Sequence, residues 1–173
     1  MVRSAGAAGI VRMFHHSAGW YESGELIPPG NWGRVLQGLG GRHPRFMLEH
    51  AWETLRTQEF PESPSRLTSA FTYPELSHAD SRVTEGAPNL YEVTLADPQS
   101  TTLFADIWWL DSGRERCHTV SDIDECIRRY WRGETVEDGM VECLVNGDLK
   151  VVRRVSSWKV PVEHEVPPTS EFR

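Results

Sequence analysis

The sequence predicts a mixed α+β fold, in which helices and strands do not alternate regularly. Three observations lead to this prediction. Helical spacing of apolar residues is concentrated in the first half, strand-like segments dominate the second half, and one further amphipathic helix pattern lies between predicted strands. A chain of 173 residues suits a single globular domain, which we expect to span residues 11–160. Residues 1–10 and the Pro- and Glu-rich residues 161–173 are expected to be flexible termini.

The composition is that of an ordinary globular protein, with 25% charged and 39% hydrophobic residues. No apolar run approaches the roughly 20 residues that a membrane helix needs. The three cysteines form neither a CxxC pair nor a zinc-binding spacing, which favours reduced thiols and no bound metal. The formal net charge of −7 disfavours an extended nucleic-acid surface. We therefore expect a cytoplasmic protein that does not enter membranes.

The N-terminal part is expected to begin with two short extended segments, at residues 11–14 and 24–27. The run Pro28-Pro29-Gly30-Asn31 then has type II turn chemistry, because proline presets φ and glycine supplies a positive φ. Asn31 is expected to cap a short helix that ends in the glycines from Gly38 onward.

A longer helix is expected to begin at Pro44 and to stop before Phe60-Pro61, since a residue before proline avoids helical backbone angles. Five apolar residues recur at helical spacing along it: Met47, Leu48, Ala51, Trp52 and Leu55. A strand is expected at residues 67–72, and Pro74 is expected to open a short helix.

Two strands are expected next, at residues 90–95 and 103–110, joined by a hairpin connection at residues 97–101. On the second of them, the neighbours Trp108 and Trp109 would point to opposite faces, so one of them would be exposed.

The last part of the predicted domain combines an amphipathic helix with a hairpin. Thr119 or Ser121 begins the helix and Gly133 ends it. Its inward residues are expected to be Val120, Ile123, Ile127, Tyr130 and Trp131. Strands at residues 140–145 and 149–155 are joined by Asn146-Gly147, which is the strongest short hairpin signal.

Three stretches carry polar groups that a pure core would not favour. In Met13-Phe14-His15-His16-Ser17, strand alternation places His15 and Ser17 on one face and His16 on the other, so at most one histidine faces a given cleft. A single histidine at a strand end is often just a hydrogen-bonded core residue. The adjacent Ser17 and Gly19 favour a ligand-facing strand end.

The other two stretches surround Glu142 and Arg66. Glu142 shares a strand face with Leu144, which fits either an edge residue facing solvent or a catalytic carboxylate in an apolar cleft. Arg66 lies in the hydroxyl-rich run of residues 65–71, which fits either a phosphate- or ribose-binding segment or a loop entering a strand. Glu49, His50 and Glu53 lie at helical spacing, for which a solvated helix face is a better explanation than a metal site.

Familiar catalytic signatures are absent from the sequence. It contains no P-loop, no dinucleotide-binding GxGxxG and no GxSxG elbow.

The three stretches together resemble the ADP-ribosyltransferase fold of the His-Tyr-Glu type, and in particular the small rifamycin-modifying ADP-ribosyltransferases. Phe14-His15-His16-Ser17 resembles the first motif, Thr68-Ser69-Ala70-Phe71 the middle motif, and the stretch from Glu142 to Gly147 the third. The segment from Gly24 to Asn31 resembles the one that follows the first motif in that family. Two residues depart from the pattern: Phe71 stands where the family has Tyr, with Tyr73 as an alternative hydroxyl, and His16 stands where Gly is frequent.

The resemblance implies a split β-sandwich that binds NAD as a co-substrate between two small sheets. It implies that His15 contacts a ribose hydroxyl, that the His16 backbone holds the nicotinamide amide, and that Phe71 stacks on the nicotinamide ring. It further implies that Glu142 stabilises the cation that forms when the nicotinamide–ribose bond breaks. Further expected NAD contacts are Ser17, Ser69, Arg66 and Arg34.

The acceptor of the ADP-ribose stays open at this point. A protein, a nucleic acid, a small molecule and water are all compatible with the sequence, as are roles as a toxin, a phage-encoded modifier or an antibiotic-modifying enzyme. A catalytically silent module of the same fold that binds NAD, a nucleotide or a protein partner is the alternative, and a plain scaffold with an exposed Trp108-Trp109 surface is a third.

Overall fold

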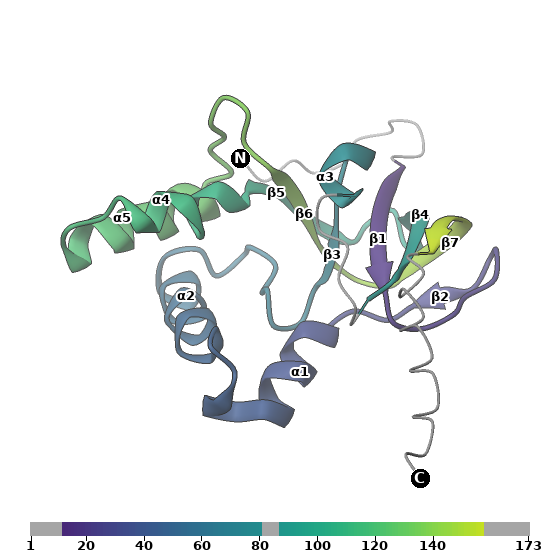
Figure 1. Ribbon diagram of the computed structural model, residues 1–173, viewed down its shortest axis with the longest axis horizontal. Coiled ribbons are helices and arrows are strands. Elements are labelled where there is room, and N and C mark those ends of the chain that lie inside the picture. Colours follow the sequence, from purple (N-terminus) through teal and green to yellow (C-terminus); the bar gives the residue numbers. More distant parts are fainter. Residues whose placement is uncertain (1–11, 81–86, 158–173) are drawn as a thin grey trace, which may run out of the picture.

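The computed structural model describes residues 12–80 and 87–157 of the chain. It is a mixed α+β structure with two antiparallel sheets (Figure 1), which confirms the predicted class. The first sheet contains, in spatial order, β1 (Met13–Ser17), β4 (Asn89–Leu95), β7 (Leu149–Ser157) and β2 (Leu26–Ile27). The second sheet contains β3 (Ala70–Thr72), β6 (Val141–Asn146) and β5 (Thr101–Asp106).

Among the described residues, one isolated bridge joins the two sheets, between Phe14 of the edge strand β1 and Tyr73, which directly follows the edge strand β3. Phe14 and Tyr73 exchange both backbone hydrogen bonds there, each with an N···O distance of 2.8 Å. Beyond this bridge no further ladder pairing between β1 and β3 occurs among the described residues. The strands therefore part just where β1 carries His15 and His16.

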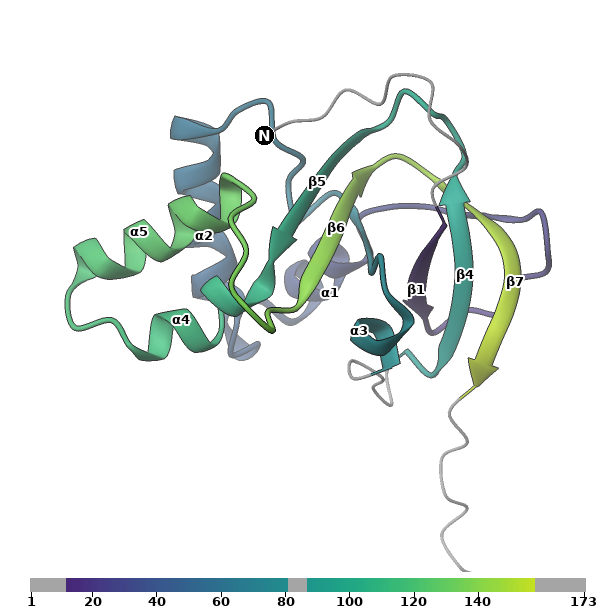
Figure 2. The same cartoon turned by 90° about the horizontal axis from the view of Figure 1, so that it is seen from above.

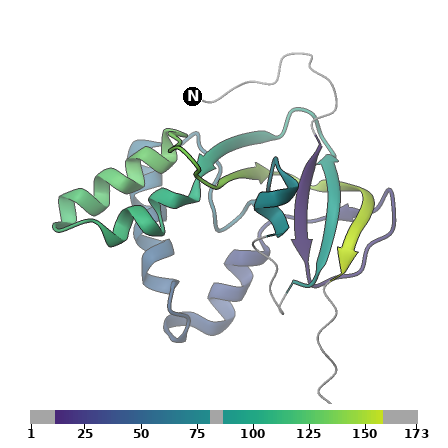
Figure 3. The ribbon, with the colours of Figure 1, turned by 45° about the horizontal axis from the view of Figure 1, so that its top comes forward.

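Apolar side chains fill two layers, one on each face of the second sheet. The layer between the sheets consists of Met13, Ile27, Ala70, Tyr91, Val93, Cys143, Val145, Leu149 and Val151. The other layer joins β5 and β6 to the helices α2 (Phe46–Glu59) and α5 (Val120–Trp131) and to the 3-10 turn η2 (Ile107–Trp109). Figures 1 and 3 show these helices on the side of the second sheet that faces away from the first. The smaller helical elements are α1 (Asn31–Leu39), η1 (Gly40–Arg42), α3 (Leu76–Asp80) and α4 (Ser112–Glu115).

Both long helices end or begin where local sequence signals predict. Helix α2 ends at Glu59, immediately before Phe60-Pro61. Helix α5 begins after Thr119 with a capping box, in which the Thr119 hydroxyl accepts from the Asp122 N–H and the Asp122 carboxylate accepts from the Thr119 N–H. The short helix α3 follows Pro74, also as predicted.

The Thr119→Ala substitution is expected to lower the free energy of unfolding by about 1 kcal/mol, because it leaves a helix N-terminal N–H without its side-chain acceptor. Urea denaturation measures this change. Ser121→Ala is the matched control, since Ser121 is exposed on the first turn of the same helix and does not cap it. An equal loss in both variants would contradict the assignment of the cap.

Both predicted hairpins are wrong. Asn146-Gly147 connects β6 in the second sheet to β7 in the first, and residues 97–101 connect β4 in the first sheet to β5 in the second. Figure 2 shows both connections passing from one sheet to the other. Turn residues specify that the chain reverses its direction locally. Which strand pairs with which depends instead on packing between segments that are distant in the sequence.

Several element boundaries also differ from the expectation. Strand β1 continues to Ser17, and β3 is shorter than predicted, beginning only at Ala70. Strand β5 ends at Asp106, so Trp108 and Trp109 lie in η2 with their rings edge to face, 5.0 Å apart, instead of on opposite faces of a strand.

Three individual residues behave differently from their sequence assignments. The N-cap of α1 is Gly30 at φ 79°, which an L-residue rarely adopts, so Asn31 is the first helical residue instead of the cap. Val120, which was expected to face inward, is 75% exposed, and Met47, one of the apolar residues at helical spacing along α2, is 74% exposed. The flexible termini expected at residues 1–10 and 161–173 lie outside the described residues.

None of the helices in the described part of the chain combines the length and the apolar character that crossing a membrane requires.

Candidate functional site

A pocket with a cavity volume of about 140 Å³ opens where β1 and β3 part. Its lining comes from β1, from β3 with the residues that flank it, from the turn before α1 and from the first residues of α1: His15, His16, Pro28, Asn31, Trp32, Ser69, Ala70, Phe71 and Tyr73. An apolar cavity of about 150 Å³ holds a benzene molecule. The pocket can therefore accept one planar ring, while the remainder of a larger ligand would extend out of it.

His15 bridges the gap between the two strands with its side chain. Its Nδ1 lies 2.7 Å from the carbonyl oxygen of Phe71, a residue 56 positions away in the sequence. Because a carbonyl oxygen only accepts, Nδ1 carries the proton and Nε2 is left as an acceptor. Burial lowers the pKa of His15 to about 4, although its bond to Phe71 works in the opposite direction. At neutral pH the pocket thus contains an uncharged imidazole whose Nε2 can accept a hydrogen bond.

The backbone of His16 lies on the edge of β1 that faces β3. Successive residues of a strand direct their N–H and C=O groups to alternate edges. Since Phe14 directs both groups to Tyr73, His16 directs its own groups to the same edge, where no described residue pairs with them. The Phe71 carbonyl that would continue the ladder accepts from His15 instead. An open donor and acceptor pair therefore borders the pocket.

Three residues of the pocket lining contain buried polar side-chain atoms that have no hydrogen-bond partner among the described residues: Nδ1 of His16, Nε1 of Trp32 and Oγ of Ser69. The His16 ring donates from Nε2 to the Ala79 carbonyl at 2.7 Å, so its Nδ1 is an acceptor. Buried polar atoms without partners are uncommon in folded proteins. Their concentration in this lining indicates a place for a polar ligand or for water.

Helix α1 is held against this region by two glycines. Gly33 packs so closely on Leu67 that an added Cβ would lie 2.1 Å from the Leu67 carbonyl oxygen. The N–H of Gly30 donates to the Ser69 carbonyl at 3.1 Å. These contacts bring Asn31 and Trp32 to the pocket. The sequence offered the turn chemistry of residues 28–31 as the signal for this segment, but not the close approach.

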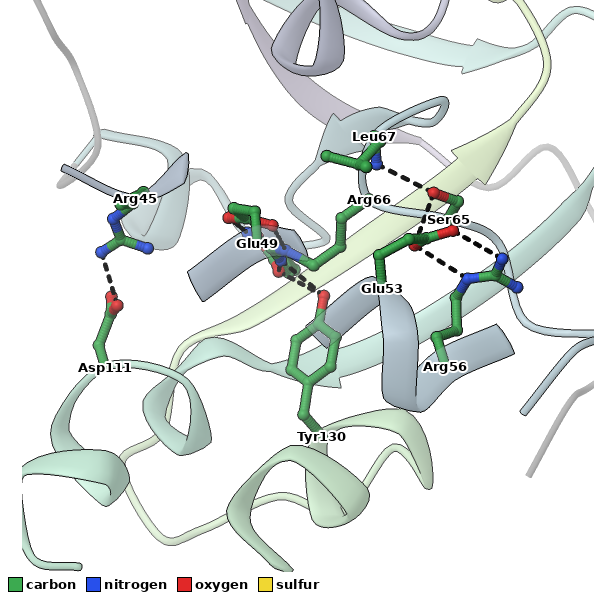
Figure 4. Close-up of polar contacts among 10 residues, drawn as sticks. Arg45, Glu49, Glu53, Arg56, Ser65, Arg66, Leu67, Asp111 and Tyr130 are labelled. Atoms are coloured by element: carbon green, nitrogen blue, oxygen red, sulfur yellow. Dashed lines mark hydrogen bonds and ion pairs between the residues drawn. The ribbon is translucent and has the colours of Figure 1, made fainter. Parts of the chain in front are cut away.

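A second cluster of four buried residues lies next to the Phe71 ring, which Arg66 contacts. Figure 4 shows its members Glu49, Arg66 and Tyr130 directed toward one another. The guanidinium of Arg66 donates to both carboxylate oxygens of Glu49, at 3.0 and 3.2 Å. It also donates to the Tyr130 hydroxyl at 2.8 Å and forms a short contact with Oε1 of Glu142. Tyr130 in turn donates to the same Oε1 at 2.6 Å. All four residues are at most 4% exposed.

The cluster has more formal negative than positive charge, because two carboxylates surround one guanidinium. Burial alone would favour an uncharged Arg66, but Glu142, Tyr130 and Glu49 outweigh it and raise the pKa of Arg66 well above its usual value. Burial and the neighbouring Glu142 likewise raise the pKa of Tyr130 well above its usual value, so its hydroxyl stays protonated and donates. Arg66 also lies over the Phe71 ring, 4.8 Å from its centroid, which connects the cluster to the pocket.

The structure brings some of the sequence-predicted site residues together and separates others. His15, His16, Ser69 and Phe71 line the pocket, whereas Arg66 and Glu142 belong to the buried cluster. Ser17 and Arg34 lie in neither. The Ser17 hydroxyl accepts from the Gly19 N–H, and the Arg34 guanidinium donates to the Pro29 carbonyl on the surface.

Two expectations need correction. The Arg66 guanidinium is occupied by two carboxylates and a phenol, so it is not available for a phosphate. Glu49 was expected on a solvated helix face but is buried, because it pairs with the buried Arg66, which also contacts Glu142 of β6. Glu49, Tyr130, Asn31 and Trp32 were therefore missed as site residues. Local patterns marked the turn at residues 28–31 and the inward side of Tyr130, but they did not show which distant residues surround these side chains.

The low pKa of His15 predicts a specific loss of stability in acid. In the unfolded chain a histidine has a pKa of about 6.5, whereas in the folded chain it is about 4. Between these values the unfolded chain binds a proton that the folded chain does not, so stability falls as the pH decreases. From pH 7 to pH 4.5 this linkage amounts to about 2 kcal/mol. Urea denaturation across this range measures it.

The control for this experiment is His15→Asn, whose amide can still donate to Phe71 but does not titrate. The wild type should lose stability in acid relative to this variant by about the stated amount. A difference between the two proteins that does not change with pH would show that His15 is not protected from protonation by the fold.

A family model described as "Protein of unknown function (DUF2441)" matches residues 34–157, which is more than half of the chain. The matched range contains β3 and the whole buried cluster, and it begins after β1 and the turn before α1. No curated protein matches the chain.

Proposed function

We propose that this chain, which belongs to the family described as protein of unknown function (DUF2441), is an NAD-dependent ADP-ribosyltransferase. The observation that carries the proposal is the meeting of His15 and Phe71 beside a pocket between two parting sheets. These residues come from the first and middle motifs of the resemblance to His-Tyr-Glu ADP-ribosyltransferases, and 56 positions separate them in the sequence. That resemblance implies a ligand at the split between two small sheets.

The pocket fits a nicotinamide ring with its carboxamide. An amide both donates and accepts, and the open His16 backbone edge offers one acceptor and one donor. Trp32 adds an N–H and Ser69 a hydroxyl, neither of which has a partner among the described residues. Arg66 lies over one face of the Phe71 ring, so the other face of Phe71 would stack on the nicotinamide ring. His15 would accept a hydrogen bond from a ribose hydroxyl through Nε2, a role that its neutral form permits.

Glu142 would supply electrostatic stabilisation. Breaking the nicotinamide–ribose bond leaves its electron pair on nicotinamide and a developing positive charge on the ribose. A carboxylate in a buried environment stabilises such a charge more strongly than it would in water. Arg66 and Tyr130 both hold Oε1 of Glu142, which orients the carboxylate. Its other oxygen, to which no described residue hydrogen-bonds, would contact the ribose 2′-hydroxyl. The acceptor that captures the ribose is a macromolecule, a small molecule or water.

One observation favours a second function, namely an NAD- or nucleotide-binding module without catalysis. Glu142 does not line the pocket and is engaged in the buried cluster. A carboxylate that stays there during binding would leave a ligand bound but unreacted. This alternative predicts that NAD stabilises the protein and that no nicotinamide is released.

The test measures nicotinamide release and thermal stability in the presence of NAD, using the purified full chain. Release together with a rise in melting temperature is the expected result, because a ligand that binds only the folded state stabilises it. A rise in melting temperature without release, also in the presence of cell extract as an acceptor source, would favour the binding module. The absence of both effects would overturn the proposal.

Phe71→Ala tests the pocket itself. Loss of the stacking surface should weaken NAD binding and abolish its effect on the melting temperature. ADP-ribose, which lacks the nicotinamide ring, should be affected much less. Equal weakening for both ligands would contradict the assignment of Phe71 to the ring. Phe104→Ala is the matched control, because Phe104 is 42% exposed on β5 and does not line the pocket.

A further inference from the structure

We propose that Cys117 and Cys126 form a reversible disulfide when the protein meets a low-molecular-weight disulfide such as oxidised glutathione. The pair lies at the α4–α5 connection, on the side of α5 that joins it to α4, and neither residue lines the pocket. The proposal does not depend on the proposed function. It concerns a modification site that no sequence motif marks, since the two cysteines are nine positions apart and match no redox motif.

The geometry of the two thiols carries the inference. Their Sγ atoms lie 3.4 Å apart, and a disulfide bond is about 2.05 Å long, so small side-chain rotations would bring them to bonding distance. Both side chains are half-buried, which leaves a route for a small oxidant. Cys143, by contrast, is fully buried between the sheets and is expected to stay reduced.

A metal site is a weaker explanation for the pair. Structural metal sites that use thiolates generally need four ligands. Among the described residues, no group of three or more histidine, cysteine or acidic side chains could hold an ion. The Cys117 thiol also donates to the Gly113 carbonyl at 3.4 Å, but a carbonyl cannot form a covalent bond with sulfur here, so the thiol of Cys126 is the reaction partner that the geometry offers.

The chemistry is a two-step thiol–disulfide exchange. The thiolate of one cysteine attacks oxidised glutathione, the sulfur–sulfur bond of the oxidant breaks, and one glutathione thiolate leaves. The thiolate of the other cysteine then attacks the mixed disulfide and releases the second glutathione. The protein loses two protons and two electrons, and one molecule of oxidised glutathione becomes two of reduced glutathione.

The rate of this closure should rise with pH. Burial and the hydrogen bond with Cys117 raise the pKa of Cys126 to about 11. Since only the thiolate attacks, a larger fraction of Cys126 is reactive at pH 9 than at pH 7. The thiolate fraction of a group that titrates well above pH 9 rises about tenfold per pH unit, so the attack by Cys126 should be about 100-fold faster at pH 9 than at pH 7.

The experiment incubates the full chain with oxidised glutathione and then counts free thiols after denaturation, with peptide mapping. The expected result is a fall from three thiols to one, and a peptide that joins Cys117 to Cys126. Reduction with dithiothreitol should restore all three. The oxidised form should melt at a higher temperature, because the bond restricts the unfolded chain. Three persistent thiols, or stable glutathione adducts without the joined peptide, would overturn the proposal.

Two variants sharpen the result. Cys126→Ser should stop the reaction at a mixed disulfide between Cys117 and glutathione, which shows that the second thiol is needed for closure. Cys143→Ala should leave closure unchanged, because Cys143 is distant in the fold and buried. Closure that persists in Cys126→Ser through Cys143 would show that the pairing is not the one proposed.

Discussion

Replacing Glu142 with glutamine is expected to reduce nicotinamide release from NAD by about 10²–10³-fold, the usual cost of losing one preorganised electrostatic group. Glutamine has nearly the same shape and keeps an oxygen that can accept from Arg66 and Tyr130. It also removes the excess negative charge, because Arg66 then faces a single carboxylate, Glu49. The fold should therefore survive the change. Steady-state nicotinamide release and the melting temperature, measured in parallel, separate lost activity from lost structure.

Glu49→Gln is the matched control for this experiment. It makes the same chemical change to the same guanidinium, and it leaves Arg66 paired with Glu142. Because Glu49 lies on α2 and is not part of any motif of the resemblance, activity should be largely retained. An equal loss in both variants would mean that the charge of the cluster matters and not Glu142 itself. Full activity in Glu142→Gln would remove Glu142 from the mechanism.

The sequence predicted the position of most elements but not which strands pair. The Asn146-Gly147 signal correctly marks the end of one strand and the start of the next. The prediction that these two strands pair with each other is wrong, because β6 pairs with β3 and β5, while β7 pairs with β4 and β2. Pairing depends on apolar faces that come from the whole chain, in particular on the layer between the two sheets. A turn of two residues contains no information about that layer.

The candidate site was predictable to a similar extent. Polar residues on buried strands drew attention to His15 and Glu142, since each needs a partner or a task. The hydrogen bonds and ion pairs that these residues form were not predictable, although the resemblance had already placed Phe71 in the same site as His15. Phe71, which accepts from His15, and Glu49, which pairs with Arg66, are 56 and 17 positions distant from those residues. Spacing within a helix or strand indicates which side chains lie on the same face of that element. It does not indicate which other element packs against this face.

Replacing Arg66 with methionine is expected to lower the free energy of unfolding by about 3–5 kcal/mol, because two carboxylates would remain buried without their shared cation. This is the largest effect on stability that we expect from a single substitution in the cluster. Methionine fills much of the same volume beside Trp52 and Phe71. The loss of unfolding free energy would therefore come mainly from the missing charge and less from changed packing. Arg66→Lys should be intermediate, since lysine keeps the charge but not the planar fork of donors. Urea denaturation measures all three proteins.

Two further variants decide whether burial of charge is the cause. Arg128→Met removes an arginine that also pairs through two nitrogens with one carboxylate, Glu59, but at the surface. Such exposed pairs contribute about 0–1 kcal/mol, so this loss should be small. Combining Arg66→Met with Glu49→Gln and Glu142→Gln removes all three buried charges, and stability should recover substantially, because no carboxylate is then buried without a cation. A triple variant as unstable as Arg66→Met would show that Arg66 stabilises the core through packing on the aromatic rings instead of through its charge.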